Sequence, residues 1–225
     1  MSEAGRARTA TELIAAGFLD AELSALLWLL TDGGVPLVVT TNHGTPIAEE
    51  LRTAMAALVG SGGTTADGAL PGGTVHGTSL EDLLRLSGAA ELAEVPDDAR
   101  ELGTVVVLGQ PDLGEGVRVV RAHYVRPIER DAAGHLQRRP PALLSALDEG
   151  TSRLDHFFWA ITDELATRVA TEAHEFDVAH RRRMRLLNEL VAARVFDGHE
   201  LRRHIERAAL VESSAMGDSQ ADTPN

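Results

Sequence analysis

The sequence contains no lysine, and all 21 of its Lys and Arg positions are arginine. Phosphate-binding loops of the form Gly-x-x-x-x-Gly-Lys-[Ser/Thr] need that lysine, because it reaches the terminal phosphates of the nucleotide. A GC-rich genome explains arginine in place of lysine on the surface, but selection would retain a lysine that takes part in catalysis. The absence therefore argues against a conventional nucleotide-hydrolysing site.

Cysteine is also absent, and aromatic residues make up only 4% of the chain. Without cysteine there are no disulfides, no thiol catalysis and no thiolate metal sites. Hydrophobic residues make up 44%, which is enough for a core of Leu, Val and Ala. No apolar run approaches the roughly 20 residues of a membrane-spanning helix, and the first residues lack a secretory apolar core. We therefore expect a cytoplasmic protein without direct membrane insertion.

Acidic residues outnumber basic ones, and the net charge is −13. Nucleic acids and anionic membranes repel such a chain, so no nucleic-acid partner is expected. The exception is a run of four arginines, Arg181, Arg182, Arg183 and Arg185. In a helix, such a run is more often a solvated face than a phosphate contact.

The first quarter of the chain predicts two short helices, a strand and a third helix, in that order. Their signals are a cap at Thr9 or Thr11, a cap at Asp20, the apolar run Val35–Val39, and Thr45 followed by Pro46. A continuous apolar run of this length is typical of a strand buried on both faces. Helices that follow a strand in this way predict an α/β fold.

Further along, Thr104–Leu108 and Val117–Val125 predict an antiparallel hairpin, and the glycine-rich stretch Gly60–Gly73 predicts a flexible connection. The resulting division is a mobile N-terminus over 1–8, an α/β domain over 9–129, a linker over 130–150, a helical extension over 151–211 and a disordered tail over 212–225. The linker prediction rests on Arg138–Arg139–Pro140–Pro141.

Three stretches, in the order in which they occur, resemble the traffic ATPases of type II and type IV secretion and of type IV and tight-adherence pili. TELIAAGFLDAELSALLWLLTDGGVPLVV is similar to the helices and strand before their phosphate loop. GGTVHGTSLEDLLRL resembles their His box, with Thr74, His76, Gly77 and Ser79 matching, and LGTVVVLGQPDLGEGVRVVRAHYVRP resembles their closing hairpin. The resemblance covers Thr9 to Pro127. It implies a shortened P-loop-NTPase-like sheet with flanking helices and a C-terminal hairpin.

The departures from that family lie at its active site. Gly44 and Thr45 remain, but where the family has Gly-Lys-Thr this chain has Pro46, Ile47, Ala48, Glu49 and Glu50. The carboxylates of Glu49 and Glu50, expected in the first turn of the helix, would repel a triphosphate. Only fourteen residues, Gly60–Gly73, separate this helix from the His-box-like segment. The acidic elements that organise Mg²⁺ in the family are missing from that interval. We therefore expect no catalytic residue and no cofactor.

Four residues are candidates for a vestigial nucleotide site: His43, Gly44, Thr45 and His76. For each histidine, a locally hydrogen-bonded structural role is the more common alternative. No metal site is predicted, because His174 and His180 do not share a helix face and the Glu200–His204 pair is more typical of a surface ion pair.

The favoured function is therefore non-catalytic: a pseudo-ATPase that binds a protein, such as a true secretion or pilus ATPase or another assembly component. The C-terminal helices are expected to carry the partner surface, since they follow a linker. The candidate contacts are Phe157, Phe158 and Trp159 together with Arg181, Arg182, Arg183 and Arg185. Two alternatives stay open: an NTPase that uses Arg52 in place of lysine, and an interaction module unrelated to secretion. Homo-oligomerisation also stays open.

Overall fold

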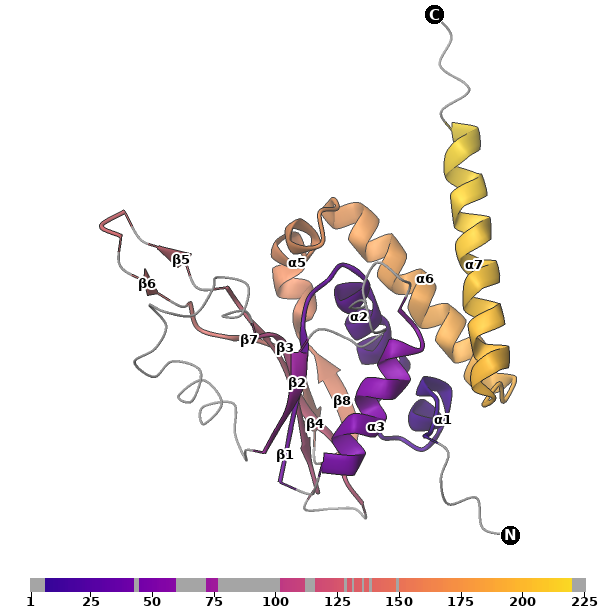
Figure 1. The fold of residues 1–225 in the computed structure, drawn as a ribbon, viewed down its shortest axis with the longest axis horizontal. Coiled ribbons are helices and arrows are strands. Elements are labelled where there is room, and N and C mark those ends of the chain that lie inside the picture. Colours follow the sequence, from indigo (N-terminus) through magenta and orange to yellow (C-terminus); the bar gives the residue numbers. More distant parts are fainter. Residues whose placement is uncertain are drawn as a thin grey trace, which may run out of the picture.

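In the computed structural model of the chain, the described residues are 7–42, 45–59, 72–76, 102–111, 116–127, 129–130, 132–134, 136–137, 139–148 and 150–219. They form an α/β fold in which helices pack against a six-stranded mixed sheet (Figure 1). The strands of this sheet are β1 (Leu37–Thr41), β2 (Gly72–His76), β3 (Gly103–Gly109), β4 (Arg118–Val125), β7 (Ala142–Asp148) and β8 (Arg153–His156). The helices are α1 (Ala10–Ala15), α2 (Ala21–Asp32), α3 (Thr45–Ala56), the 3-10 turn η2 (Phe158–Ile161), α5 (Thr162–Arg168), α6 (Ala173–Ala192) and α7 (Gly198–Ser219). A separate two-stranded ribbon consists of β5 (Glu129–Arg130) and β6 (Leu136–Gln137).

The sheet has the strand order β2-β1-β3-β4-β7-β8, and β1 runs parallel to both of its neighbours. Every residue of β1 is buried. Val39 belongs to the main core, whereas Val38 packs with Val105 and Val125 on the opposite face. The predicted strand buried on both faces is thus confirmed, although it begins at Leu37. Val35 instead closes α2, its amide donating to the Leu30 carbonyl at 2.9 Å.

The predicted caps and hairpin are also confirmed. Thr9 forms a capping box with Glu12 at the start of α1, and the Asp20 carboxylate accepts from the Leu23 amide at 2.8 Å at the start of α2. Strands β3 and β4 pair antiparallel, with an irregularity between Val107 and Leu108. These elements form where local sequence signals place them.

Helix α2 is buried on all sides. Ten of its side chains are buried, including Ser24, Trp28 and Leu29, which lie off the Leu23–Leu27–Leu30 stripe. Figure 1 shows the reason, because α2 lies between the sheet and α6. A helix that is apolar all round needs cover on both sides. In this fold, the sheet provides one cover and the C-terminal helix α6 the other.

The structure differs from the predicted linker and helical extension. Residues Ala142–Asp148, expected within a linker over 130–150, form β7 between β4 and β8. The region over 151–211 begins with strand β8 of the same sheet, and its helices share one continuous core with α1 to α3. The two prolines mark only the start of β7. Because Leu144 and Ser145 are completely buried, this segment belongs to the fold and does not form a hinge.

Both ends of the chain also differ from expectation. Arg8, placed in the mobile N-terminus over 1–8, is bonded to Glu50 of α3. Helix α7 continues to Ser219, so residues 212–219 extend this helix where a disordered tail over 212–225 was expected. In the predicted connection Gly60–Gly73, Gly72 and Gly73 belong to β2, and residues 60–71 lie outside the described part.

Because the C-terminal helices share the core with the rest of the fold, we expect that a chain lacking them will not fold stably. A protein ending at Gly150 loses β8, α5 and α6, and so exposes the apolar side of α2 that α6 covers. We expect it to aggregate or to lack a cooperative thermal transition, measured by circular dichroism and sedimentation. A soluble remnant with a cooperative transition would show that these helices form a separate unit.

A point substitution tests the same packing without shortening the chain. Leu187 of α6 is completely buried, so Leu187→Ala should lower the free energy of unfolding by about 2–5 kcal/mol in urea titrations. Val178 of the same helix is 51% exposed, and Val178→Ala should change stability by no more than about 0.5 kcal/mol. Equal effects of the two substitutions would contradict the packing of α6 on α2.

Candidate functional site

The turn between β1 and α3 is where the resemblance to the traffic ATPases implies a phosphate loop. Of the four vestigial candidates, His43 and Gly44 lie outside the described residues, and Thr45 is the first residue of α3. His76 ends β2 and pairs in register with Thr41, at the carboxyl end of β1. The pairing of β1 with β2 therefore places the His76 backbone beside the end of β1, where the turn to α3 begins. The side chains of Thr45 and His76 lie outside the described part.

Glu50 of α3 is bonded to Arg8, which comes just before α1 in the chain. The guanidinium donates through Nε to Oε1 and through Nη2 to Oε2, both at 2.8 Å, and the Arg8 amide donates to Oε1 at 3.1 Å. These hydrogen bonds, led by that of the Arg8 side chain, lower the pKa of the Glu50 carboxyl below its usual value. Glu50 is thus an ionised group that fastens the N-terminal segment to α3.

The neighbouring charges also contact the fold. Glu49 accepts a hydrogen bond from the Thr74 hydroxyl of β2, and its carboxylate lies 3.8 Å from Arg52 Nε. Arg52 Nη1 donates to the Leu37 carbonyl at 2.7 Å, at the end of β1 remote from the turn. This contact directs Arg52 Nη1 away from the turn. One correction concerns the helix, since the first turn of α3 holds no acidic residue and both glutamates fall in the second.

The three aromatic candidates separate into one core residue and two surface residues. Phe158 is only 6% exposed, and its ring packs edge-on against His156 and His180, with centroids 6.1 and 4.8 Å away. It is therefore unavailable as a surface anchor, contrary to the prediction. Trp159 is 67% exposed and Phe157 39%, and the Trp159 indole N–H donates to the His156 carbonyl at 2.7 Å. These two side chains remain on the surface.

The two histidines beside Phe158 have pKa values shifted in opposite directions. Burial alone would lower the pKa of His156, but the hydrogen bond from Nε2 to Asp20 Oδ2 at 2.9 Å and the nearby charges of Glu22 and Asp155 outweigh it and raise the pKa. Burial lowers the pKa of His180, whose Nε2 lies 3.0 Å from the Glu22 carbonyl oxygen. The His156–Asp20 hydrogen bond thus joins β8 to the start of α2.

The four arginines of α6 do not form one stripe, because consecutive helical residues point in different directions. Arg181 is bonded to Asp177 of its own helix. Arg183 donates to Asp32 Oδ2 at 2.8 Å, and its guanidinium lies 4.7 Å from the centre of the Trp28 ring. Arg182 and Arg185 are exposed. Arg183 therefore connects α6 to α2. Arg182 and Arg185 place their positive charge on the surface of α6.

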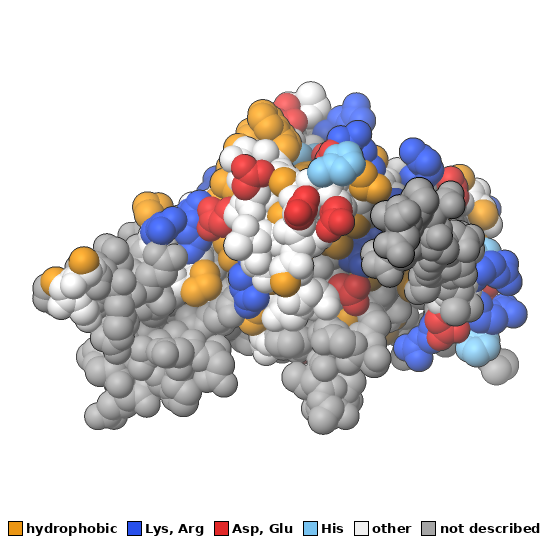
Figure 2. All heavy atoms as spheres, turned by 90° about the horizontal axis from the view of Figure 1, so that it is seen from above, with side chains coloured by type: hydrophobic (Ala, Val, Ile, Leu, Met, Phe, Trp, Pro, Cys, Tyr) orange, Lys and Arg blue, Asp and Glu red, His pale blue; other side chains and the backbone are white. Residues whose placement is uncertain are grey.

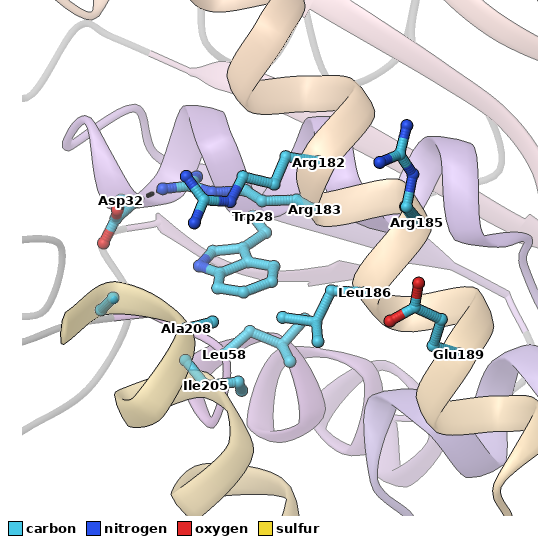
Figure 3. Close-up of a pocket in the computed structure, with 11 residues that line it drawn as sticks. Trp28, Asp32, Leu58, Arg182, Arg183, Arg185, Leu186, Glu189, Ile205 and Ala208 are labelled. Atoms are coloured by element: carbon cyan, nitrogen blue, oxygen red, sulfur yellow. Dashed lines mark hydrogen bonds and ion pairs between the residues drawn. The ribbon is translucent and has the colours of Figure 1, made fainter. Parts of the chain in front are cut away.

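A hollow of about 370 Å³ lies where α2, α6 and α7 meet the end of α3. Figure 3 shows Arg182 and Arg183 over one side of the Trp28 ring, and Leu58, Leu186 and Ile205 toward the other. The full lining is Trp28, Asp32, Leu58, Arg182, Arg183, Arg185, Leu186, Glu189, Ile205, Ala208 and Ala209. The sequence reasoning missed Trp28, Asp32 and Ile205 as members of this site. The available signal was Trp28 itself, an apolar residue off the main stripe of its helix.

The described residues contain no group of three His, Asp or Glu side chains placed to hold a metal ion. Among these residues, no helix combines the length and apolar character that crossing a bilayer requires. No protein-family model matches the chain, and no curated protein matches it in sequence. What the protein does must therefore be inferred from its own geometry.

The His156–Asp20 contact predicts a pH-dependent stability. Because the folded state raises the pKa of His156 above its ordinary 6.5, the pair stabilises the fold at acidic pH and this contribution is lost as the pH rises through the raised pKa. The difference in unfolding free energy between wild type and His156→Gln should be largest near about pH 5.5 and shrink toward about pH 8.5.

Asp20→Asn is the matched variant, because asparagine keeps the helix cap and removes the charge. It should show the same loss of pH dependence in urea titrations. The groups facing His156 are Asp20 and Glu22 of α2, Asp155 of β8 and His180 of α6. All of these except the substituted one stay in place in each comparison. A difference that stays constant over this pH range would contradict the ion pair.

Proposed function

We propose that this protein is a non-catalytic, shortened relative of the secretion and pilus traffic ATPases, a pseudo-ATPase that acts by binding another protein. The order of elements supports the relationship: α1 and α2 lead into the buried strand β1, a turn and helix α3 follow, and the β3–β4 hairpin comes later. The register that places His76 beside Thr41 agrees with a His box near the former nucleotide site.

The proposal that the protein is non-catalytic depends on one observation: the charged side chains of α3 form contacts within the fold. Glu50 is bonded to Arg8, Glu49 to Thr74, and Arg52 to the Leu37 carbonyl. A phosphate site needs cations and amide groups directed at the anion. Within the described residues, Arg52 of α3 instead donates a hydrogen bond at the opposite end of β1. This arrangement also disfavours an NTPase in which Arg52 replaces the lysine.

The protein-binding part is supported by the helical layer. Between Arg181 and Ala209 the chain has eight arginines and four carboxylates, although the whole chain has a net charge of −13. Figure 2 shows basic side chains at the right of the view, on the side that α7 occupies in Figure 1. Charge of this sign on an acidic protein favours association with an acidic partner. Trp159 and Phe157 add exposed aromatic surface.

An interaction module unrelated to secretion would use the same surface and equally lack nucleotide chemistry. No family model matches the chain, so the comparisons do not favour the secretion assignment over this alternative. The genomic position distinguishes the two: a gene for a full-length traffic ATPase beside this one supports the secretion or pilus assignment.

Nucleotide titration tests the non-catalytic assignment. We expect isothermal titration with Mg-ATP to give no dissociation constant tighter than about 1 mM, and phosphate release to stay at background, because no lysine reaches the turn and Arg52 is engaged elsewhere. A micromolar constant would overturn the proposal. Hydrolysis in the wild type that Arg52→Ala abolishes would establish the arginine-substituted enzyme instead.

A further inference from the structure

The hollow between α6 and α7 has an apolar floor and a charged rim, the features of a groove that binds a helix. The two helices separate after the turn that joins them, and Figure 1 shows α7 extending away from the rest of the fold. Among the α7 side chains that the structure describes, Leu201 is buried and Ile205 is half-buried, so the first turns of this helix pack on the fold. The hollow lies between the two helices, with lining residues from both.

The floor of this groove is apolar and the ring at its centre is fixed. Trp28 is only 6% exposed, and the guanidinium of Arg183 lies over its face while bonded to Asp32. Leu186 and Ile205 continue the apolar surface from α6 and α7. An apolar floor between two helices is the usual receptor for the apolar face of an amphipathic helix.

The rim of the groove is basic. Arg182 and Arg185 line it from α6, and both are exposed. Within the described part of the chain, Arg185 takes part in no ion pair, and Figure 3 shows its guanidinium directed away from Glu189. A rim charge of this kind mainly sets which partner approaches and how fast it associates. The charge that complements this rim is negative.

We propose that this groove binds an acidic amphipathic helix of a partner protein, whose apolar face packs on Trp28, Leu186 and Ile205 and whose flanking carboxylates meet Arg182 and Arg185. The inference rests on the proposed protein-binding function and names the class of partner. Nucleic acid fits less well, because Asp32 and Glu189 also line the hollow and the chain carries a net charge of −13. A small free anion would leave the apolar floor uncovered.

The test uses the full-length chain and a designed probe. The probe is a fluorescein-labelled peptide of about 18 residues, or ~5 helical turns, with Leu at i, i+3, i+4 and i+7 spacing and Glu beside this stripe. One control peptide carries Lys at every Glu position, and another has the same composition with the spacing scrambled. We expect fluorescence anisotropy to show binding of the acidic amphipathic peptide alone, weakening as salt rises from about 50 to about 500 mM.

Two variants locate the binding. Arg185→Glu reverses a rim charge, and Ala208→Phe fills the groove from α7; each should weaken binding about tenfold. The control is Arg203→Glu, which makes the same charge change at an exposed position of α7 that does not line the hollow. It should change the affinity by no more than about twofold. Urea titrations of all three variants confirm that the fold is retained.

Several outcomes would overturn the inference. These are no binding of the acidic peptide, equal binding of the Lys peptide, or binding that neither Arg185→Glu nor Ala208→Phe weakens. Self-association that Ala208→Phe abolishes would identify a second copy of this chain as the occupant and would also overturn it. Failure here leaves the nucleotide titration unaffected, so the loss of catalysis and the identity of the groove's occupant are judged separately.

Discussion

The burial of α2 on all sides is the constraint on which the rest of the structure depends. A helix with leucines on one stripe and Trp28 and Leu29 on the others cannot leave any face in water without losing a large hydrophobic contribution. The sheet covers one side, and α6 has to cover the other. This requirement draws α6, in the C-terminal third of the chain, into the core, while β7 and β8 join the same sheet by pairing next to β4.

Around the β1–α3 turn, charged side chains connect parts of the fold that lie far apart in the sequence. Glu50 receives the guanidinium of Arg8, and Arg52 caps the first carbonyl of β1. Each is a charge-assisted hydrogen bond between elements distant in sequence. These side chains connect the N-terminal segment, the helix and the strand.

The helical layer holds some of its charged and aromatic side chains inside the fold and leaves others on the surface. Arg183 and Phe158 are held inside it, by Asp32 and Trp28 in one case and by two histidines in the other. Arg185, Trp159 and Phe157 stay on its surface. The separation is decided residue by residue, since neighbours on a helix point about 100° apart. Of the four arginines that are close in sequence, Arg183 therefore forms a contact between helices, and the other three lie on the surface.

The sequence by itself determined the elements whose signals are local: the Thr9 and Asp20 caps, the strand buried on both faces, α3 and the β3–β4 hairpin. It also determined the missing lysine and the excess of arginine after residue 180. Only the tertiary structure decided that Ala142–Asp148 is a strand of the main sheet and not a linker, that Phe158 is core, and that Arg8 meets Glu50. These outcomes depend on partners far away along the chain, such as Asp32 for Arg183, and local periodicity and turn chemistry carry no information about such partners.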